Sequence, residues 1–505
     1  MLGATRRQFL ADGAAAASSL ALLGLPLVGL PLVGCALGAD GQNLAAPAAA
    51  GLSDAALLDD LEQRTFQYFQ HTTPARSGLA PDRWPSPSFC SIAAVGFGLS
   101  AHVIGAGQGW LPHAQARELA LTTLRFFHDA PMGPGARGVA GHRGFFYHFI
   151  GMDTGERFGT CELSTVDTAL LLAGVLHAAQ YFSTNHWADA EIRRLADNLA
   201  ERVDWRWAQV RPPSISHGWT PEAGFLGSDW KGYNEAMLVY LLALGSPGRT
   251  VDAEAWAAWS AWTSEYGRSW ATFHGQTHLH FAPLFGHQYT HCWVDFRGIR
   301  DGWMREVAAV DGRAPGLDYF ENSRRATLAQ RAYAQANPLG WKGYGGDVWG
   351  ITACDGPADV VRVYQGKKRR FISYAGRGAG GHTTYDDGTL APTAALGSLP
   401  FAPEIVLPAL RALRTQYGEA IYQRHGFVDS FNPSFDFADV PLAHGKLVPG
   451  LGWVDTDHLG IDQGPISLMA ANHRRGDVWR LMRGNAQLRR GLQRAGFTGG
   501  WLDGT

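Results

Sequence analysis

Glu235 is the residue whose setting is best suited to proton donation. It follows two aromatic side chains and an amide, and it falls in the first turns of a helix predicted over residues 231–244, which Asp229 is expected to cap. A carboxyl group among such neighbours would have a raised pKa and could act as a general acid. The alternative is an ordinary solvent-facing glutamate that complements the dipole of the helix.

Asp462 is the matching candidate for a base. It is expected to cap a helix over residues 462–474, with Pro465 inside the first turn. Because the amides at a helix N-terminus stabilise negative charge, this carboxylate would stay ionised. Capping alone would explain the residue, but an ionised carboxylate is also what a general base requires, and the two roles are compatible.

A further acidic pair lies around Ser164. Ser164 and Asp167 have the spacing of a capping box in which Asp replaces the usual Glu or Gln, and Glu162 precedes them by two residues. The pattern favours helix capping over catalysis for Asp167, although a capping residue can also contact a ligand.

His287 and His291 are four residues apart, so on a helix they would share one face, as zinc ligands do. Gln288 stands where a zinc protease carries its glutamate, and no third ligand is obvious. We therefore expect both histidines to bond ligand hydroxyls or the protein core, and no metal or organic cofactor is implied. The remaining cysteines have no zinc or redox spacing, and buried free thiols are expected, with one late disulfide left open: Cys90, Cys161, Cys292 and Cys354.

The glycine-rich segment 343–350 lacks the Gly-Lys signature of a phosphate-binding loop. We expect a flexible loop that presents Trp349 to a ring-shaped ligand. No Gly-x-Ser-x-Gly elbow is present, which argues against a serine hydrolase of that type.

The composition agrees with a neutral ligand. The 505 residues include 18 Trp, 15 Tyr and 25 Phe, only 17% are charged, and the formal net charge is −2. Such a chain is not disordered, collagen-like or a coiled coil, and it is not basic enough to bind nucleic acid. Stacking on hydroxyl-rich ligands such as sugars would explain the Trp content, and a large aromatic core would explain it equally well.

The first 50 residues are expected to direct export. Arg6 and Arg7 precede an apolar run and resemble a twin-arginine signal, and a Leu-Val-Gly-Cys sequence ending at Cys35 resembles a lipoprotein cleavage site. Residues 1–34 would then be removed, Cys35 would anchor the protein to a membrane through lipid, and residues 35–50 would form a tether. The expected location is the periplasm or the outer membrane. The alternative is an uncleaved membrane anchor.

The candidate residues must be positioned by helices, because apolar residues recur at three- and four-residue spacing in many windows. The absence of a sustained strand–helix alternation argues against a parallel α/β fold. One domain over residues 51–505 is predicted, an all-α dominated (α/α)6 toroid in which six helical hairpins close into a ring, with short β hairpins in long loops. The loops 268–316 and 337–390 are expected around its central depression. The predicted helices are 53–70, 89–103, 113–128, 164–182, 187–204, 231–244, 252–267, 317–336, 391–398, 403–416, 462–474 and 476–495, and the β-like runs are 144–150, 348–354, 359–364 and 371–374.

Seven stretches spread over about residues 55–495 resemble, in this order, the bacterial glycoamylase-like domain family, which includes endo-β-1,2-glucanases. The stretches are Ser164–Leu172, Trp230–Pro247, His287–Gly298, Tyr319–Pro338, Trp349–Pro357, Asp387–Pro403 and Leu459–Met469. Any one of them alone would be a weak signal, whereas seven in order are fairly specific.

The resemblance implies the (α/α)6 fold and an inverting glycoside hydrolase that acts on β-1,2-linked glucose polymers or oligosaccharides. It implies that Glu235 is the general acid, that Asp462 is the base, and that Glu162 and Asp167 form an acidic cluster near the glycone side of the pocket. An inverting pair of carboxyl groups stands roughly 6.5–9.5 Å apart, with room for a water. The expected partner is a neutral glucan, and the further candidates for substrate binding are Trp230, Tyr233, His287, His291, Trp293, Arg297, Trp349 and Asp387.

Two other functions stay open. A polysaccharide lyase on the same toroid would need a cation to neutralise a uronate and a Tyr or His base, and Tyr289, His291 and Arg297 could supply these. A non-catalytic, lipid-anchored glycan-binding protein would bind sugar and release no product.

Overall fold

The computed structural model describes residues 51–260, 270–310, 317–380 and 384–504. The signal and tether expected over residues 1–50, with Cys35, lie outside them. The helices are α2 (Asp54–Thr72), α3 (Ile92–Gly107), α4 (His113–Asp129), α5 (Thr165–Tyr181), α6 (Trp187–Glu201), α7 (Met237–Gly245), α8 (Glu254–Ser260), α9 (Gly302–Val310), α10 (Tyr319–Ala336), α11 (Pro392–Leu396), α12 (Pro403–Tyr417), α13 (Gly460–Arg474), α14 (Asp477–Met482) and α15 (Ala486–Arg494), with 3-10 turns η1 (Leu284–His287), η2 (Thr290–Cys292), η3 (Gly418–Ala420) and η4 (Gly500–Leu502).

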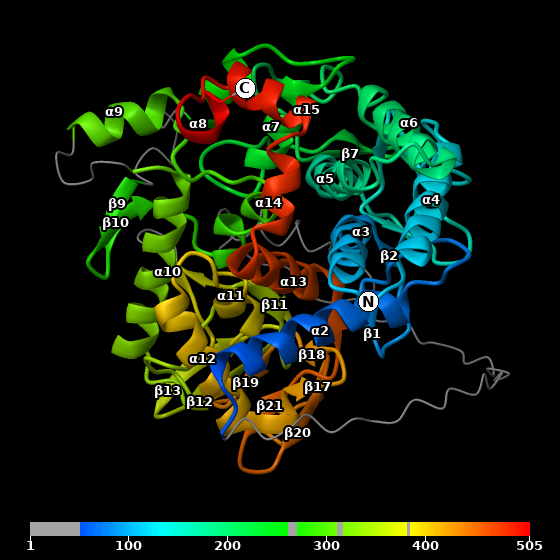
Figure 1. Ribbon diagram of the computed structural model, residues 1–505. Coiled ribbons are helices and arrows are strands. Elements are labelled where there is room, and N and C mark those ends of the chain that lie inside the picture. The colour runs from blue at the N-terminus through cyan, green and yellow to red at the C-terminus, as the bar shows by residue number, and fades with distance from the viewer. Residues whose placement is uncertain (1–50, 261–269, 311–316, 381–383, 505) are drawn as a thin grey trace, which may run out of the picture.

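The helices form a ring of inner and outer members (Figure 1). The inner helices α3, α5, α7, α11 and α13 are buried nearly all round, which is the property of a helix surrounded by other helices. The outer helices α4, α6 and α12 instead bury one face and expose charged residues on the other.

The sixth inner position is taken by the turns η1 and η2. Gln288, between them, donates to the carbonyl of Ala394 in α11 at 2.7 Å, and Thr290 donates to the carbonyl of Glu235, just before α7, at 3.4 Å. These turns therefore lie between α7 and α11. The predicted (α/α)6 toroid is confirmed.

Two glycines set the spacing between α3 and α5. A Cβ atom on Gly174 would lie 2.0 Å from the carbonyl oxygen of Gly96, and one on Gly96 would lie 2.2 Å from that of Leu170. Only glycine permits this approach, so the two inner helices touch backbone to backbone.

The strands are short and lie in the loops. They are β1 (Arg83–Trp84), β2 (Cys90–Ser91), β3 (Gly141–His142), β4 (Phe145–Phe146), β5 (Phe149–Ile150), β6 (Leu163–Ser164), β7 (Gly218–Thr220), β8 (Gly224–Phe225), β9 (Trp270–Phe273), β10 (Gln276–Leu279), β11 (Ala353–Asp355), β12 (Val360–Tyr364), β13 (Lys367–Phe371), β14 (Tyr374–Gly376), β15 (Gly378–Ala379), β16 (Thr384–Tyr385), β17 (Tyr422–Gln423), β18 (Gly426–Phe427), β19 (Phe431–Asn432), β20 (Lys446–Val448), β21 (Gly452–Val454) and β22 (His458–Leu459). All the ladders between them are antiparallel, and none has more than three strands among the described residues.

Several elements differ from the sequence prediction. The helix expected to start at residue 231 starts at Met237, because Gly232 has a positive φ of 72° and the side chain of Asn234 holds a turn by accepting from the amide of Ala236. The helix expected over 476–495 is two helices, with Asn485 capping the second. The expected loop 268–316 contains α9 and the β9–β10 hairpin.

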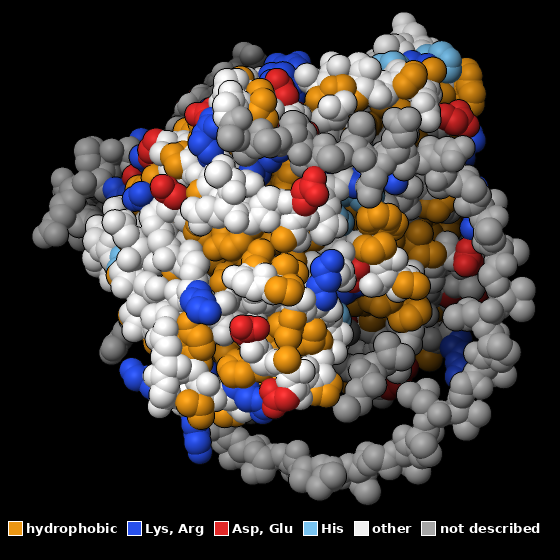
Figure 2. Space-filling view, turned by 90° about the horizontal axis from the view of Figure 1, so that it is seen from below, with side chains coloured by type: hydrophobic (Ala, Val, Ile, Leu, Met, Phe, Trp, Pro, Cys, Tyr) orange, Lys and Arg blue, Asp and Glu red, His pale blue; other side chains and the backbone are white. Residues whose placement is uncertain are grey.

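Four cysteines are free thiols, as expected, and all are buried: Cys90, Cys161, Cys292 and Cys354. Among the described helices, none is both long and apolar enough to cross a membrane. On the face seen from below in Figure 1, charged side chains are scattered singly among hydrophobic ones (Figure 2), which matches the low charge of the composition.

Candidate active site

The N-terminal ends of the inner helices form one face of the ring, which we call the mouth. Each outer helix returns the chain across the ring, so successive inner helices run in the same direction. Three of them begin directly after a short paired strand: β2 leads into α3, β6 into α5 and β22 into α13.

Backbone hydrogen bonds connect these strands into a belt around the mouth. The belt runs from the start of α13 past α3 and α5 to the segment before α7. Its bonds are Gly460 N to Asp82 O at 2.9 Å, Ile92 N to His148 O at 3.4 Å, His148 N to Glu162 O at 2.9 Å, Thr165 N to His217 O at 3.2 Å and Trp230 N to Ile215 O at 2.9 Å. The predicted acid and base therefore lie at two ends of one hydrogen-bonded structure.

Glu235 is held immediately before α7. The Asn234 side chain accepts from Ala236 N at 3.0 Å and from the Trp259 indole at 3.1 Å, so the residues on both sides of Glu235 are fixed. The Glu235 side chain is buried, with 3% of its surface exposed. Asp229 is not the cap of this helix, because α7 begins at Met237 and Ala236 occupies the cap position. Asp229 instead forms an ion pair with Arg211 at 2.5 Å.

Asp462 lies in the first turn of α13. The helix starts at Gly460, two residues earlier than expected, and Leu459 occupies the cap position, so Asp462 is not the cap. Its backbone carbonyl accepts from Thr393 of α11 at 3.2 Å, and its side chain is 4% exposed. The first turn of a helix favours a negatively charged side chain, which suits a base.

Glu162 and Asp167 are joined by a histidine. His148 Nδ1 lies 3.0 Å from Glu162 Oε1, and its Nε2 lies 3.5 Å from Asp167 Oδ2. The expected Ser164 cap is confirmed, since its Oγ accepts from Asp167 N at 3.2 Å, and it also donates to Asp167 Oδ2 at 2.5 Å. The imidazole stacks on Phe149 at 3.9 Å, so both carboxylates are fixed by a rigid ring.

Sequence reasoning missed His148. It lies in the predicted β-like run 144–150, but nothing in its spacing links it to Glu162, 14 residues later. No local pattern could have found it, because the fold brings Glu162 and Asp167 to it.

Trp230 connects this acidic cluster to the segment that carries Glu235. Its indole donates to Thr165 Oγ1, at the start of α5, at 2.9 Å, and its ring stacks on His217 at 3.8 Å. His217 is the second residue that the sequence analysis did not identify.

Tyr233, His287 and His291 lie in the interior of the ring. The Tyr233 hydroxyl lies 3.4 Å from Ser323 Oγ, which lies 3.1 Å from His291 Nε2, and the Tyr233 ring is 4.9 Å from that of His287. Burial raises the pKa of Tyr233 to about 12, lowers that of His291 to about 3 and lowers that of His287 well below its ordinary value. These side chains are therefore neutral, and the two histidines are core residues.

Trp293 and Arg297 lie away from the mouth. The Trp293 indole donates to Ser100 at 2.9 Å, in the middle of α3 and about 12 Å from the mouth along the helix axis. Arg297 pairs with Asp295 at 2.8 Å and lies 4.4 Å over the ring of Trp479 in α14. The structure therefore does not place either side chain at the mouth, where both are expected to bind substrate.

Trp349 lies in a hydrophobic core and not, as the sequence prediction had it, in a ligand-presenting loop. It is 1% exposed and packs in a hydrophobic core with residues of α2, α11 and α12. A Cβ on Gly350 would come within 2.9 Å of Ala391 O, so the segment is pressed against α11. The loop does not present Trp349 to a ligand, because burial of the apolar ring in the core stabilises the fold.

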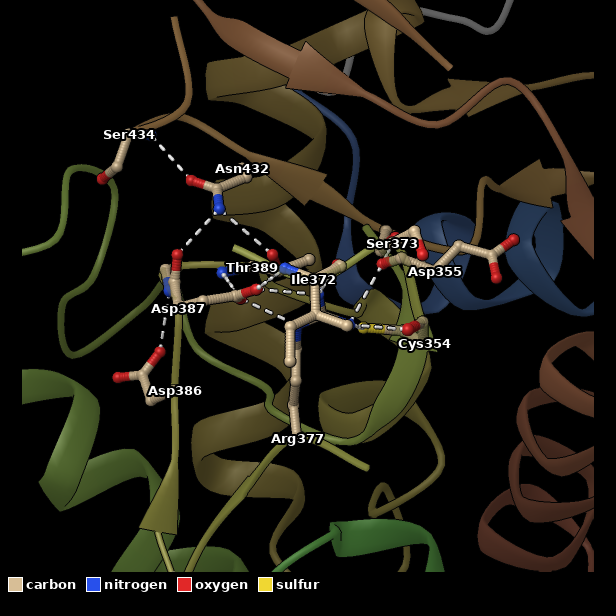
Figure 3. Close-up of polar contacts among 12 residues, drawn as sticks. Cys354, Asp355, Ile372, Ser373, Arg377, Asp386, Asp387, Thr389, Asn432 and Ser434 are labelled. Carbon is tan, nitrogen blue, oxygen red and sulfur yellow. Dashed lines mark hydrogen bonds and ion pairs between the residues drawn. The ribbon is translucent and has the colours of Figure 1, made fainter. Parts of the chain in front are cut away.

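Asp387 forms a fully buried ion pair (Figure 3). Its two oxygens accept from Arg377 Nε at 2.7 Å and Nη2 at 2.8 Å, and its carbonyl accepts from Asn432 at 2.9 Å. Because Arg377 takes both carboxylate oxygens, Asp387 supports the loop behind the mouth and is not a substrate ligand.

Residues 227–486 match the Glycoamylase family, described as "Putative glucoamylase". The chain belongs to this family. Among curated relatives of the family, an exo beta-1,2-glucooligosaccharide sophorohydrolase (non-reducing end) from Parabacteroides distasonis is 26% identical over 472 residues, which are 88% of this chain and 58% of that relative. The chain thus spans less than two thirds of the relative's length.

Solved structures of the Glycoamylase type are similar over most of the chain. A "putative glucoamylase" from Bacteroides fragilis is 27% identical with a TM-score of 0.74, covering 90% of this chain and 100% of the other. An endo-beta-1,2-glucanase from Chitinophaga pinensis, solved with sophorotriose and glucose, is 25% identical with a TM-score of 0.72, covering 89% and 100%.

Proposed function

We propose that this chain is a glycoside hydrolase that cleaves β-1,2-linked glucan or its oligosaccharides. The observation that carries the proposal is the placement of two buried carboxylates, Glu235 and Asp462, at the starts of two inner helices on one mouth. Glycoside hydrolysis needs such a pair, one to donate a proton and one to activate water. The β-1,2 linkage comes from the names of the relatives from Parabacteroides distasonis and Chitinophaga pinensis.

In the proposed reaction, Glu235 protonates the glycosidic oxygen as the bond to the anomeric carbon breaks. Asp462 accepts a proton from the water that attacks this carbon from the opposite face. Inversion requires a gap of roughly 6.5–9.5 Å between the two carboxyl groups. Glu162 and Asp167, fixed by His148, would accept hydrogen bonds from hydroxyls of the glycone sugar.

The three residues that could serve a polysaccharide lyase do not lie together at the mouth. Tyr289 is 8% exposed and packs between Phe97 and Phe285, while His291 is neutral in the core. Arg297 is paired with Asp295 away from the mouth. These three side chains do not combine at the mouth, where a uronate would need a cation and a base.

We also propose that the protein is exported and anchored to a membrane. A twin-arginine signal over residues 1–34 and a lipid on Cys35 would place the enzyme in the periplasm or on the outer membrane, where extracellular or periplasmic glucan is available. Mass spectrometry of the N-terminal peptide from membrane fractions would detect the diacylglyceryl group, and an unmodified Cys35 in a chain that retains Met1 would refute it.

The test of the function is incubation of the mature chain with linear β-1,2-glucan, with starch, β-1,3-glucan and polyuronate in parallel. Chromatography should detect sophorose if the enzyme works from a chain end, or a ladder of oligosaccharides if it cuts internally. If starch alone were cleaved, the substrate would be starch and the proposed β-1,2-glucan would be refuted. Sugar binding with no product from any polymer would favour a glycan-binding protein and refute catalysis.

A further inference from the structure

Three aspartates from separate segments meet beside the mouth. Asp355 ends β11, Asp429 follows β18, and Asp455 follows β21. One carboxylate oxygen from each lies within 4.8 Å of the other two, and it is the one group of three or more His, Cys, Asp or Glu that meets this criterion in the described part of the chain. Oxygens on opposite sides of a Ca²⁺ ion stand about 4.6–5.2 Å apart, so the spacing fits a shared cation.

The cluster is deeply buried and lies among further charged groups. Arg83 contacts Asp355 at 2.7 Å, and it also contacts Asp82 at 3.3 Å and Asp457 at 3.6 Å. The three aspartates of the cluster are each at most 2% exposed. Because buried carboxylates are stabilised by a nearby positive charge, a bound cation would stabilise the cluster.

Asp455 supplies an independent observation that points to a ligand. Its Oδ1 accepts from the amides of Thr456 at 2.6 Å and Asp457 at 3.1 Å, whereas its Oδ2 is buried and has no hydrogen-bond partner among the described residues. Burial, then the charges of Asp355 and Asp429, raise the pKa of Asp455 well above its ordinary value.

The backbone around the cluster is already ordered. Asp429 Oδ2 accepts from Asp355 N at 2.7 Å, Ser430 Oγ donates to Asp355 O at 2.9 Å, and Asp455 N donates to Ser430 O at 3.0 Å. These bonds tie the three segments together independently of any ion, so the donor oxygens are positioned in advance.

We propose that Asp355, Asp429 and Asp455 bind one divalent cation, and that the ion is Ca²⁺. The donors are all oxygens, which Ca²⁺ prefers, and Asp455 adds a buried carboxylate oxygen, Oδ2, that has no hydrogen-bond partner among the described residues. Arg83 belongs to β1, which pairs with β22 directly before α13. The ion would therefore stiffen the side of the mouth that carries Asp462.

The test uses the mature chain after treatment with a chelator and dialysis. Isothermal titration with CaCl₂ should give one site per chain, elemental analysis should give about one calcium per chain after gel filtration, and saturating Ca²⁺ should raise Tm. Asp455→Asn and Asp429→Asn should each weaken Ca²⁺ binding at least tenfold, whereas Asp439→Asn, an exposed aspartate that pairs with Arg362, should bind as the wild type does.

Two results would overturn the site. One is the absence of stoichiometric Ca²⁺ uptake by the wild-type chain, which decides the matter even if a variant fails to fold. The other is uptake that Asp455→Asn leaves unchanged. Without Ca²⁺, Asp455→Asn should melt no lower than the wild type, because it removes a repelling charge, so a misfolded variant is recognised by its melting curve. None of these readouts depends on glucan hydrolysis.

Discussion

Two carboxylate clusters lie beside the mouth, one next to α5 and the other next to α13, and their carboxylates have different partners. Beside α5, His148 stands between Glu162 and Asp167, and its two ring nitrogens face one carboxylate each. Beside α13, Asp355 and Asp455 meet with Asp429, and Arg83 pairs with Asp355. The first cluster holds a histidine between its carboxylates, whereas in the second the Oδ2 atom of Asp455 is buried without a hydrogen-bond partner among the described residues. This difference predicts that mutation of His148 lowers stability through the first cluster, whereas binding of a metal ion raises stability through the second.

The largest expected effect is on kcat, and it comes from Asp462, the proposed base, which lies near the second cluster. Asp462→Asn should lower kcat on the order of 10²–10⁴-fold, because it removes the proposed base while keeping the size of the side chain. Steady-state kinetics on β-1,2-glucan measures this. Glu254→Gln, an exposed first-turn carboxylate of α8, is the matched control and should change kcat less than twofold. Near wild-type kcat for Asp462→Asn would remove Asp462 from the mechanism.

His148→Leu should destabilise the fold by about 3 kcal/mol, the upper range for hydrogen bonds to charged groups, because it leaves two buried carboxylates facing an apolar side chain. Denaturant unfolding measures the loss. Added Ca²⁺ should not restore this stability if the two clusters are independent. His128→Leu, a half-exposed histidine on α4, should change stability by less than about 0.5 kcal/mol. Rescue of His148→Leu by Ca²⁺ would show that the contrast between the clusters is false.

Glu162→Gln should raise KM about tenfold and change kcat less, because a hydrogen bond to a charged group that forms in both ground and transition states contributes binding alone. Glu156→Gln, which is exposed and six residues earlier, should leave KM unchanged. A fall in kcat with unchanged KM would instead assign Glu162 to the chemical step.

The smallest expected effect is the coupling between the clusters. The free-energy changes of His148→Leu and Asp455→Asn should add within about 0.5 kcal/mol, because the residues share no hydrogen bond or ion pair. A double-mutant cycle in denaturant, without Ca²⁺, measures it. A coupling above 1 kcal/mol would indicate that the belt of backbone bonds transmits strain across the mouth.

The ring could be predicted from the sequence because helices such as α3 and α5 are apolar over whole turns, and the Ser164 cap because its partner is three residues away. The positions of Trp293, Arg297 and Trp349 could not, since spacing within a segment does not say which end of the ring it reaches. His148 and Asp455 were missed for the same reason: their partners are brought to them by the closure of the ring, and no local pattern records it.

The role of Glu235 as the acid is tested most directly by the turnover of Glu235→Gln on β-1,2-glucan, measured beside its binding of a β-1,2-gluco-oligosaccharide by calorimetry. If Glu235 donates the proton, kcat should fall by a factor on the order of 10²–10⁴, with Kd within a few-fold of the wild type and an unchanged melting curve. A variant that still releases product at close to the wild-type rate would contradict it, because the proton would then come from a group other than Glu235.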